Sequence, residues 1–162
     1  MKISYLLICM VFEILCVSAE CPDNWVRHAD SCYLFINRYI MEWIDAMTFC
    51  ETFDAKLAEV ETAVEETFLR HEANIYGAGR GSFWIGGSDV MAEGKWKWMT
   101  SNTPINYTNW ARGSPSNSYG AEHCLCLYYH AQFFWNDESC TTRNPFICEK
   151  DANSPALGFL VG

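Results

Sequence analysis

Cysteines carry the clearest chemistry in this chain of 162 residues, which holds nine of them. Two, Cys9 and Cys16, fall in an N-terminal stretch that we expect to be removed. The other seven are Cys21, Cys32, Cys50, Cys124, Cys126, Cys140 and Cys148. So many cysteines behind a secretory leader predict a disulfide framework. Because seven is odd, one thiol is free or pairs with another chain.

Counting alone leaves the connectivity of these cysteines open. Their spacing suggests a short loop from Cys21 to Cys32, a long clamp, and a short C-terminal loop. A clamp from Cys50 to Cys148 would close nearly the whole domain. On the chain-entropy model, closing a loop of about 100 residues stabilises a fold by roughly 4–5 kcal/mol.

Catalytic patterns are weak in this sequence. His71-Glu72 begins like the H-E-x-x-H motif of zinc proteases, but Ile75 stands where the second histidine is required. Cys126 has histidines nearby in the sequence, which could suggest thiol catalysis. An oxidising extracellular compartment disfavours a catalytic thiol. There is no glycine-rich phosphate cradle and no nucleophile elbow. We therefore expect a protein that is not an enzyme.

Residues 1–19 have the pattern of a signal peptide. Lys2 supplies the positive start, an apolar run follows, and Val17-Ser18-Ala19 forms a small-residue cleavage site. The run is too short to span a bilayer, and Glu13 interrupts it. These features predict a secreted, extracellular protein without membrane insertion. Asn106-Tyr107-Thr108 is then a candidate glycosylation sequon, with Asn106 as the acceptor.

The composition narrows the possible partners. The formal net charge is −9, which disfavours nucleic acid and anionic membrane surfaces because both need a basic face. An acidic surface favours cations instead. Aromatic residues make up 15% of the chain and charged residues 19%, which is typical of a packed domain rather than a disordered one.

Two helices and several strands must position whatever site exists. Residues 21–40 are aromatic and β-branched and predict a strand, a turn at 29–31 and a second strand. Helical spacing predicts a helix over 41–53 and another over about 60–74. In the second helix, Thr62 and Glu65 could form a capping box. We expect Val64, Phe68 and Ile75 on its buried face and Glu61, Glu65, Glu66, Arg70 and Glu72 on its wet face.

The second half of the chain is richer in strands and loops. Residues 83–87 predict a buried strand followed by a turn, and the alternation at 95–98 predicts a strand with one buried face. Residues 100–120 predict a long irregular loop, of a kind that is usually functional. Short strands are expected at 124–129, 133–135 and 145–149, and a loose tail at 151–162.

Six motifs in this order resemble the C-type lectin-like domain. They are Trp84-Ile85-Gly86-Gly87, Trp96-Lys97-Trp98, Asn109-Trp110, Glu122-His123-Cys124, Trp135-Asn136-Asp137 with Cys140, and Pro145-Phe146-Ile147-Cys148-Glu149. Each motif alone is weak evidence for this family. Six motifs in the family's order, with the cysteines at matching positions, are specific for it. Within that family, the sequence resembles small secreted invertebrate lectins of the perlucin-like kind.

The resemblance implies an α+β fold over residues 20–150, with two helices flanking small antiparallel sheets, a long irregular loop and disulfide staples. It also implies the pairings Cys21–Cys32, Cys50–Cys148 and Cys124–Cys140. Cys126 is then the odd thiol. Free cysteine behaves as a small buried hydrophobe, and the alternative is a bridge to a second copy, giving a homo-oligomer.

The resemblance further implies one Ca²⁺ site shared with vicinal sugar hydroxyls, so that glycans are the expected partners. Calcium takes six to eight oxygen ligands. The matching positions are Ser114, Ser116, Glu122, Asn136 and Asp137, with Ser114, Ser116, Glu122 and Asn136 also facing sugar. Tyr119 is a candidate for stacking on the sugar, whereas Trp96, Trp98 and Trp110 are expected in the core.

Ser114-Pro115-Ser116 departs from the family pattern, which places an acid or amide on each side of a cis-proline. A hydroxyl is a poorer calcium ligand, and serine donates or accepts either way, so the family's rule that separates mannose from galactose preference does not apply to this motif. In the auxiliary calcium site of some members, His123 and Asn117 stand where acids are needed, so we expect that site weak or empty.

Two functions therefore remain open. Glu122, Asn136 and Asp137 favour a calcium-dependent lectin that recognises microbial or self glycans. The Ser-Pro-Ser loop instead favours a module that binds protein or a mineral such as calcium carbonate, which the net charge of −9 would suit.

Overall fold

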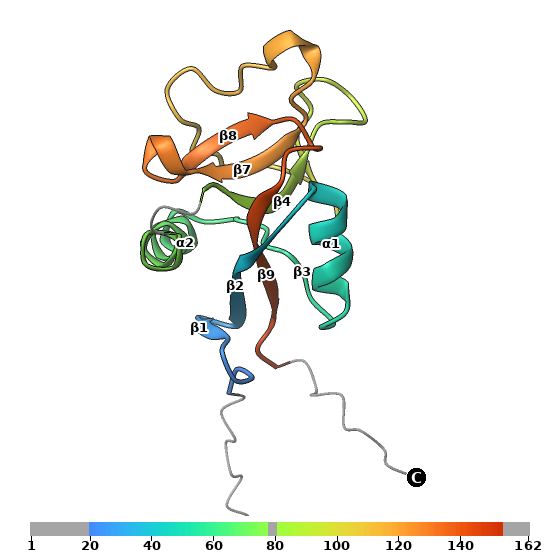
Figure 1. The fold of residues 1–162 in the computed structure, drawn as a ribbon. Coiled ribbons are helices and arrows are strands. Elements are labelled where there is room, and N and C mark those ends of the chain that lie inside the picture. Colours follow the sequence, from blue (N-terminus) through green and yellow to red (C-terminus); the bar gives the residue numbers. More distant parts are fainter. Residues whose placement is uncertain (1–19, 78–80, 154–162) are drawn as a thin grey trace, which may run out of the picture.

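The computed structural model describes residues 20–77 and 81–153 (Figure 1). The predicted signal peptide at 1–19 and residues 154–162 of the predicted tail lie outside this range. In chain order the elements are β1 (Val26–His28), β2 (Ser31–Met41), α1 (Trp43–Glu51), β3 (Lys56–Leu57), α2 (Ala63–Tyr76), β4 (Phe83–Ser88), β5 (Lys97–Trp98), β6 (Thr103–Pro104), η1 (Ser118–Gly120), β7 (Cys124–Tyr128), η2 (Tyr129–Ala131), β8 (Phe134–Glu138) and β9 (Asn144–Asp151).

The second strand of the domain pairs with the last one. β2 runs antiparallel to β9 from Ser31 opposite Asp151 to Ile36 opposite Phe146, and β1 pairs with β2. β4 lies on the other side of β9 and carries β5 and β7, and β8 pairs with β7. In Figure 1, β1, β2 and β9 lie at one end, and β7, β8 and the long loop lie at the other. The loop is therefore displayed far from the place where the domain begins and ends.

Several predicted boundaries shift in the structure. The first strand begins at Val26 rather than Cys21, with a turn at 29–30 before β2. The long loop contains the short strand β6 and the turn η1, and β8 continues past residue 135 to Glu138. At the C-terminus, β9 includes Asp151, and Ala152 is buried with its backbone N–H donating to the Asp30 carbonyl at 2.7 Å. The predicted tail thus begins in ordered structure.

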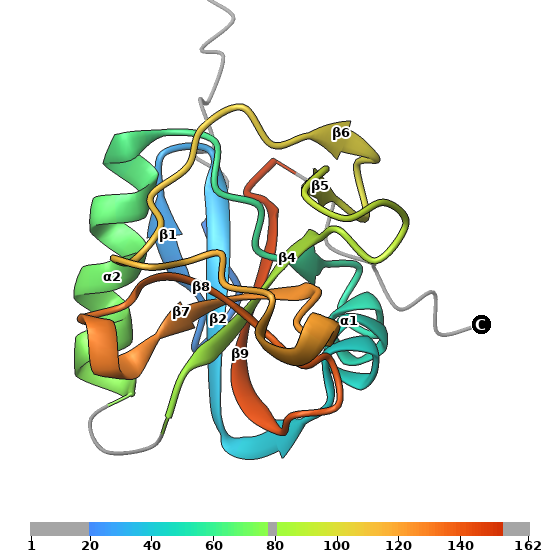
Figure 2. The same ribbon diagram turned by 90° about the horizontal axis from the view of Figure 1, so that it is seen from above.

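The two helices lie on opposite sides of the sheet, with α2 on one flank and α1 on the other (Figure 2). Thr62 caps α2 as predicted, because its side chain accepts a hydrogen bond from the Glu65 backbone N–H at 3.2 Å. The Glu65 carboxylate, however, accepts from the Glu61 backbone N–H at 2.9 Å instead of from that of Thr62. Only half of the capping box forms.

The predicted buried face of α2 is wrong at two of its three positions. Val64 is 70% exposed and Ile75 is 59% exposed, whereas Glu66, Leu69 and Ala73 are buried. Phe68 is partly buried against the core. The inward face is thus formed by Glu66, Leu69 and Ala73, which are spaced three and four residues apart. Hydropathy alone assigns the carboxylate of Glu66 to solvent, so the face could not be predicted from it.

Glu66 tolerates burial because two side chains donate to it. One carboxylate oxygen accepts from the Trp135 indole N–H at 2.6 Å, and the other accepts from the Asn109 amide at 3.1 Å. Burial raises the pKa of the Glu66 carboxyl above its ordinary value, although both hydrogen bonds oppose that shift. The contact joins α2 to β8 and to the middle of the long loop.

The glycines of β4 lie inside the strand and not in the predicted turn. A Cβ on Gly87 would lie 2.6 Å from Leu125 Cδ2, and one on Gly86 would lie 2.9 Å from the Leu57 carbonyl oxygen. Neighbouring chain therefore approaches both positions too closely for a side chain. This allows β4 to pack centrally between β7 and β9.

The three disulfides implied by the resemblance are present: Cys21–Cys32, Cys50–Cys148 and Cys124–Cys140. Cys126 is free and buried on β7. Burial, followed by the nearby Glu138 carboxylate, raises the pKa of the Cys126 thiol well above its ordinary value. This position favours the small-hydrophobe interpretation over a bridge to a second copy, which needs an accessible sulfur.

Glu66→Ala should lower the free energy of unfolding by about 2–4 kcal/mol, because it leaves the donors of Trp135 and Asn109 without an acceptor, at about 1–3 kcal/mol each. Val64→Ala in the same helix is the control, and its exposed side chain should change stability by less than about 0.5 kcal/mol. Urea denaturation with the disulfides intact measures both. The opposite order of effects would show that Val64, not Glu66, faces the core.

Cys126 should resist alkylation by iodoacetamide in the folded protein and react once denaturant is added, because a buried thiol with a raised pKa forms little thiolate. Mass spectrometry counts the modified thiols under both conditions. Labelling of the folded protein at the denatured rate would mean that Cys126 is accessible.

Candidate functional site

β8 presents the two residues at the centre of the predicted calcium site. Burial alternates along this strand, so that Trp135 and Asp137 are buried and Asn136 is half-buried. Trp135 lies in the core beside Trp98 and Trp110. That packing fixes the strand, and the two polar residues after Trp135 meet the long loop.

Asp137 has no exposed surface, and its carboxylate holds the loop by its backbone. One oxygen accepts from the Ser116 N–H at 2.8 Å, and the other accepts from the Asn117 N–H at 2.5 Å. Two successive backbone donors thus satisfy both oxygens of a carboxylate that is shielded from water. Asp137 therefore anchors the segment that directly follows Pro115.

The serine hydroxyls reach the other predicted ligands. Ser114 donates to the Asn136 amide oxygen at 2.5 Å, and Ser116 donates to the Glu122 carboxylate at 2.8 Å. The same Glu122 oxygen accepts from the Ser118 N–H at 2.8 Å. Because the Asn136 amide also donates to the Asp137 carbonyl, the five predicted ligand residues are joined in one hydrogen-bonded cluster between the long loop and β8. We call it the loop cluster: Ser114, Ser116, Glu122, Asn136 and Asp137.

The backbone of this loop is unusual in three places. The Ser114–Pro115 bond is cis, and both Asn117 and Tyr119 have positive φ angles of 42° and 57°. The Asn117 side chain accepts from the Glu122 N–H at 3.2 Å, which closes the turn onto β7. Tyr119 projects fully into solvent. No contact ties it to the loop cluster, so its stacking role stays a prediction.

The ligand atoms of the loop cluster are of the kind that binds a hard cation. It offers two carboxylates, one amide and two hydroxyls, and calcium prefers oxygen atoms of these kinds. Hydrogen bonds already hold the Ser114 and Asn136 side chains, and those of Ser116 and Glu122, next to each other. A small rotation of each hydroxyl would let both oxygens of a pair face the same ion. Glu122 and Asn136 are only half-buried, which leaves this side of the cluster open to solvent.

A second cluster was missed from the sequence. Asp89, Glu93 and His123 place one ligand atom each within 4.8 Å of one another. Of these three residues, the sequence analysis considered only His123, because it stands where the auxiliary calcium site of some family members has an acid. The available signal was Asp89, an acid directly after the buried strand β4.

The remaining candidates occupy the expected surroundings. Asn106 is exposed, which a glycosylation acceptor requires, and its use stays a prediction. Trp98 is buried, while Trp96 and Trp110 are partly buried against the core. These tryptophans support the loop rather than form an open platform.

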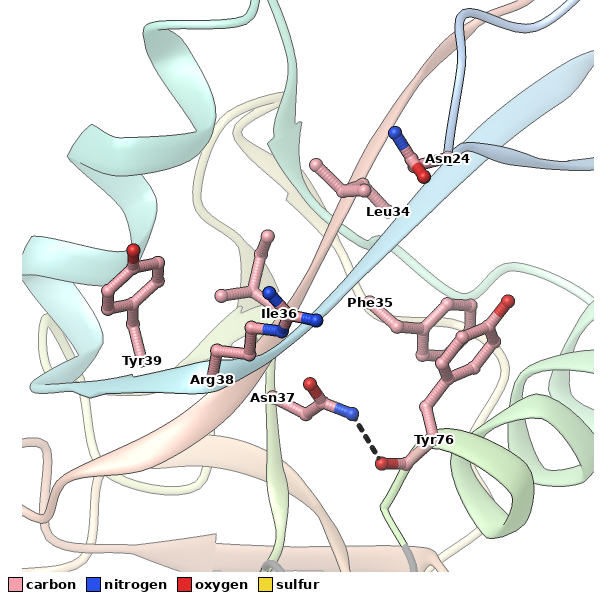
Figure 3. A pocket seen from close by; sticks show the side chains of 8 residues that line it. All are labelled: Asn24, Leu34, Phe35, Ile36, Asn37, Arg38, Tyr39 and Tyr76. Carbon is pink, nitrogen blue, oxygen red and sulfur yellow. Dashed lines mark hydrogen bonds between the residues drawn. The ribbon is translucent and has the colours of Figure 1, made fainter.

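A pocket of about 520 Å³ lies on another part of the molecule, over β2 (Figure 3). Leu34, Ile36 and Tyr39 line it together with Tyr76 of α2, whose carbonyl accepts from the Asn37 amide at 2.6 Å. Its lining includes no carboxylate and no residue of the loop cluster. It does not provide the ligands of a cation site.

Comparison with known proteins decides the family. A family model described as the Lectin C-type domain matches residues 39–150. The chain belongs to the C-type lectin domain family. The match includes both helices, the long loop and β8.

Two curated relatives have similar lengths. Perlucin from Haliotis laevigata is 35% identical over 81% of this chain and 83% of its own. The galactose-specific lectin nattectin from Thalassophryne nattereri is 31% identical over 83% of this chain and 82% of its own. Lectin-family relatives of this kind are not enzymes, in line with the expectation from the motifs.

Solved C-type lectin structures confirm the fold class. The carbohydrate-recognition domain of the human scavenger receptor C-type lectin superposes with a TM-score of 0.72 at 36% identity, covering 82% of this chain and 99% of that one. In residues 20–77 and 81–153 this chain combines two α-helices, a long loop and three disulfides with one nine-stranded sheet, and not with the small, purely antiparallel sheets that were expected, because β4 and β9 pair in parallel and join the strands into one sheet. Among the residues that the structure describes, no helix is long and apolar enough to cross a bilayer.

Proposed function

We propose that this chain is a secreted lectin that binds carbohydrate through a calcium ion held by the loop cluster. The observation that supports this most is the convergence of Glu122, Asn136 and Asp137 with the two serines around one turn of the loop. The family membership supports carbohydrate binding, as do the names of nattectin and the scavenger-receptor domain.

Each residue of the loop cluster has a distinct part in the proposal. Asp137 fixes the loop backbone, and together with Glu122 it supplies the negative charge that a divalent cation requires. Asn136 and Glu122 lie at the half-buried rim, where their oxygens can bind both the ion and a sugar hydroxyl. A bound Ca²⁺ would contribute coordination of two vicinal hydroxyls.

The serines set the expected strength and selectivity. Ser114 and Ser116 bring neutral hydroxyls to positions where the family pattern has acids or amides. Fewer charged ligands weaken calcium binding, so an affinity in the range of extracellular modules, about 10⁻⁴–10⁻³ M, is expected. Because a hydroxyl can donate or accept, the site has no built-in preference between mannose-type and galactose-type hydroxyl pairs.

Glu122→Gln should weaken calcium binding by at least about tenfold and reduce sugar binding in parallel, because it removes one of two carboxylates from the ligand set. Asp137→Ala should abolish both. Isothermal titration calorimetry with CaCl₂ measures the first effect, and binding to a sugar-coated resin measures the second.

Glu51→Gln on the exposed end of α1 is the matched control, since it removes the same charge far from the loop. Near-ultraviolet circular dichroism checks that Asp137→Ala still folds. Calcium affinity equal to wild type in Glu122→Gln would exclude the loop cluster as the calcium site.

Ser114→Glu combined with Ser116→Asn should tighten calcium binding and add selectivity for mannose-type sugars. The pair restores an acid and an amide on the two sides of Pro115, and both side chains replace weaker hydroxyl ligands. Calorimetry and competition with free mannose and galactose measure the two gains. An unchanged calcium affinity would show that the loop does not bind a cation.

A further inference from the structure

We propose that a pocket beside the loop cluster binds an anionic group of the glycan, next to the sugar that the calcium ion holds. The inference rests on the proposed function and names the class of glycan, one that carries a carboxylate or a sulfate. The pocket has a volume of about 340 Å³ and lies between the long loop, η2 and β8. Trp110, Arg112, His130, Gln132 and Phe134 are among the residues that line it.

The pocket borders the loop cluster along β8. Phe134 and Asn136 are both half-buried and alternate with buried Trp135 and Asp137, so they share the outward face of the strand. Two residues of a strand advance the chain by about 6.6 Å. The pocket therefore begins next to the amide that the proposed function assigns to the sugar.

The long loop brings the pocket and the loop cluster together a second time. The Ser114 N–H donates to the Ala111 carbonyl at 3.0 Å, which closes a turn that contains Arg112. The Ser114 hydroxyl then donates to the Asn136 amide oxygen at 2.5 Å. The loop wall and the strand wall of the pocket thus lead to the same hydrogen bond of the loop cluster, so a glycan bound at that cluster has its substituents within reach of the pocket.

The charges around the pocket are opposite to those of the chain as a whole. The chain has 20 acidic residues against 11 lysines and arginines, yet none of the described residues that line this pocket carries a carboxylate. Arg112 is exposed and has no ion pair or hydrogen bond within residues 20–77 and 81–153. Its positive charge is therefore available to a ligand.

Two side chains of the pocket can donate to an anion. The guanidinium of Arg112 is a planar fork of donors that matches two oxygens of one anionic group. His130 packs edge-on against the rings of Tyr128 and Tyr129, and in the described part of the chain its ring nitrogens have no hydrogen-bond partner. Imidazole can donate to a ligand oxygen from either of these nitrogens.

The apolar walls of the pocket are fixed in the free protein. The guanidinium of Arg70 lies 3.6 Å from the centre of the Phe134 ring, and its Nε–H donates to the Gln132 carbonyl at 3.0 Å. Trp110 packs against the core. A pocket with walls already in place loses little conformational entropy when a ligand binds.

Calcium makes this surface acceptable to an acidic ligand. The Glu122 and Asp137 carboxylates of the loop cluster repel an anion, and a bound divalent cation offsets their two charges. Binding of an acidic sugar should therefore require Ca²⁺, as binding of a neutral sugar does in the proposed function.

The test is competition for binding to a galactose-coated resin in calcium buffer by lactose, 6′-sialyllactose and 6′-sulfolactose. All three leave vicinal hydroxyls of the galactose ring free for the ion, and the second and third add a carboxylate and a sulfate. An acidic sugar should inhibit at an at least about fivefold lower concentration than lactose, because it gains charge-assisted hydrogen bonds at a partly exposed site. The advantage should shrink in about 1 M NaCl, where the Debye length falls to about 3 Å.

The two acidic sugars identify the anionic group. An advantage of 6′-sialyllactose alone would assign the pocket to carboxylates, and an advantage of 6′-sulfolactose alone would assign it to sulfates. Either result supports the proposal.

Three variants locate the anion. Arg112→Gln should remove most of the advantage and leave inhibition by lactose unchanged, which also shows that the variant folds. His130→Gln should remove part of the advantage. Arg38→Gln on β2 is the matched control, because it removes the same charge at an exposed position outside this pocket, and it should keep the full advantage.

The outcomes separate this inference from the proposed function. Calcium-dependent inhibition of equal strength by all three sugars, or an advantage that survives in Arg112→Gln, would overturn the acidic-sugar pocket and leave the calcium-dependent lectin standing. Binding of acidic sugars that persists in EDTA and is lost in Arg112→Gln would support the pocket and contradict the calcium site. Binding of none of the three sugars in calcium buffer would contradict both.

Discussion

The contact between the buried Asp137 carboxylate and the backbone of residues 116–117 is the constraint on which the candidate site depends. The long loop has little regular structure of its own, so its shape comes from such anchors. Asp137 is itself fixed by β8, which pairs with β7 along its whole length and carries Trp135 into the core. The sheet thereby positions a loop that the sheet does not contain.

A second buried carboxylate, that of Glu66, also fixes the position of β8 and of the long loop. Glu66 accepts from Trp135 and from Asn109, which lies in the middle of the loop. An unpaired carboxylate would be costly to bury, so both of its oxygens need donors. Glu66 joins β8 to α2, and Asp137 joins β8 to the loop. Both contacts depend on the position of Trp135 in the core.

Local signals predicted what local interactions determine. The cap at Thr62 involves residues three apart, and the strands carry their own alternation and β-branched residues. The resemblance supplied the disulfides and the members of the loop cluster. Glu66 was placed on the wrong face because its donors lie 43 and 69 residues away, which helical periodicity cannot reveal. The cluster at Asp89 and Glu93 was missed for the same reason, since His123 reaches it only when β4 and β7 pair.

Calcium-dependent carbohydrate binding is the central claim, and a glycan array tests it most directly. The wild-type protein should bind glycans in calcium buffer, lose that signal in EDTA, and regain it when Ca²⁺ alone is restored. Glycan binding that persists in EDTA would contradict a calcium-mediated site, and a blank array in calcium would contradict carbohydrate binding itself.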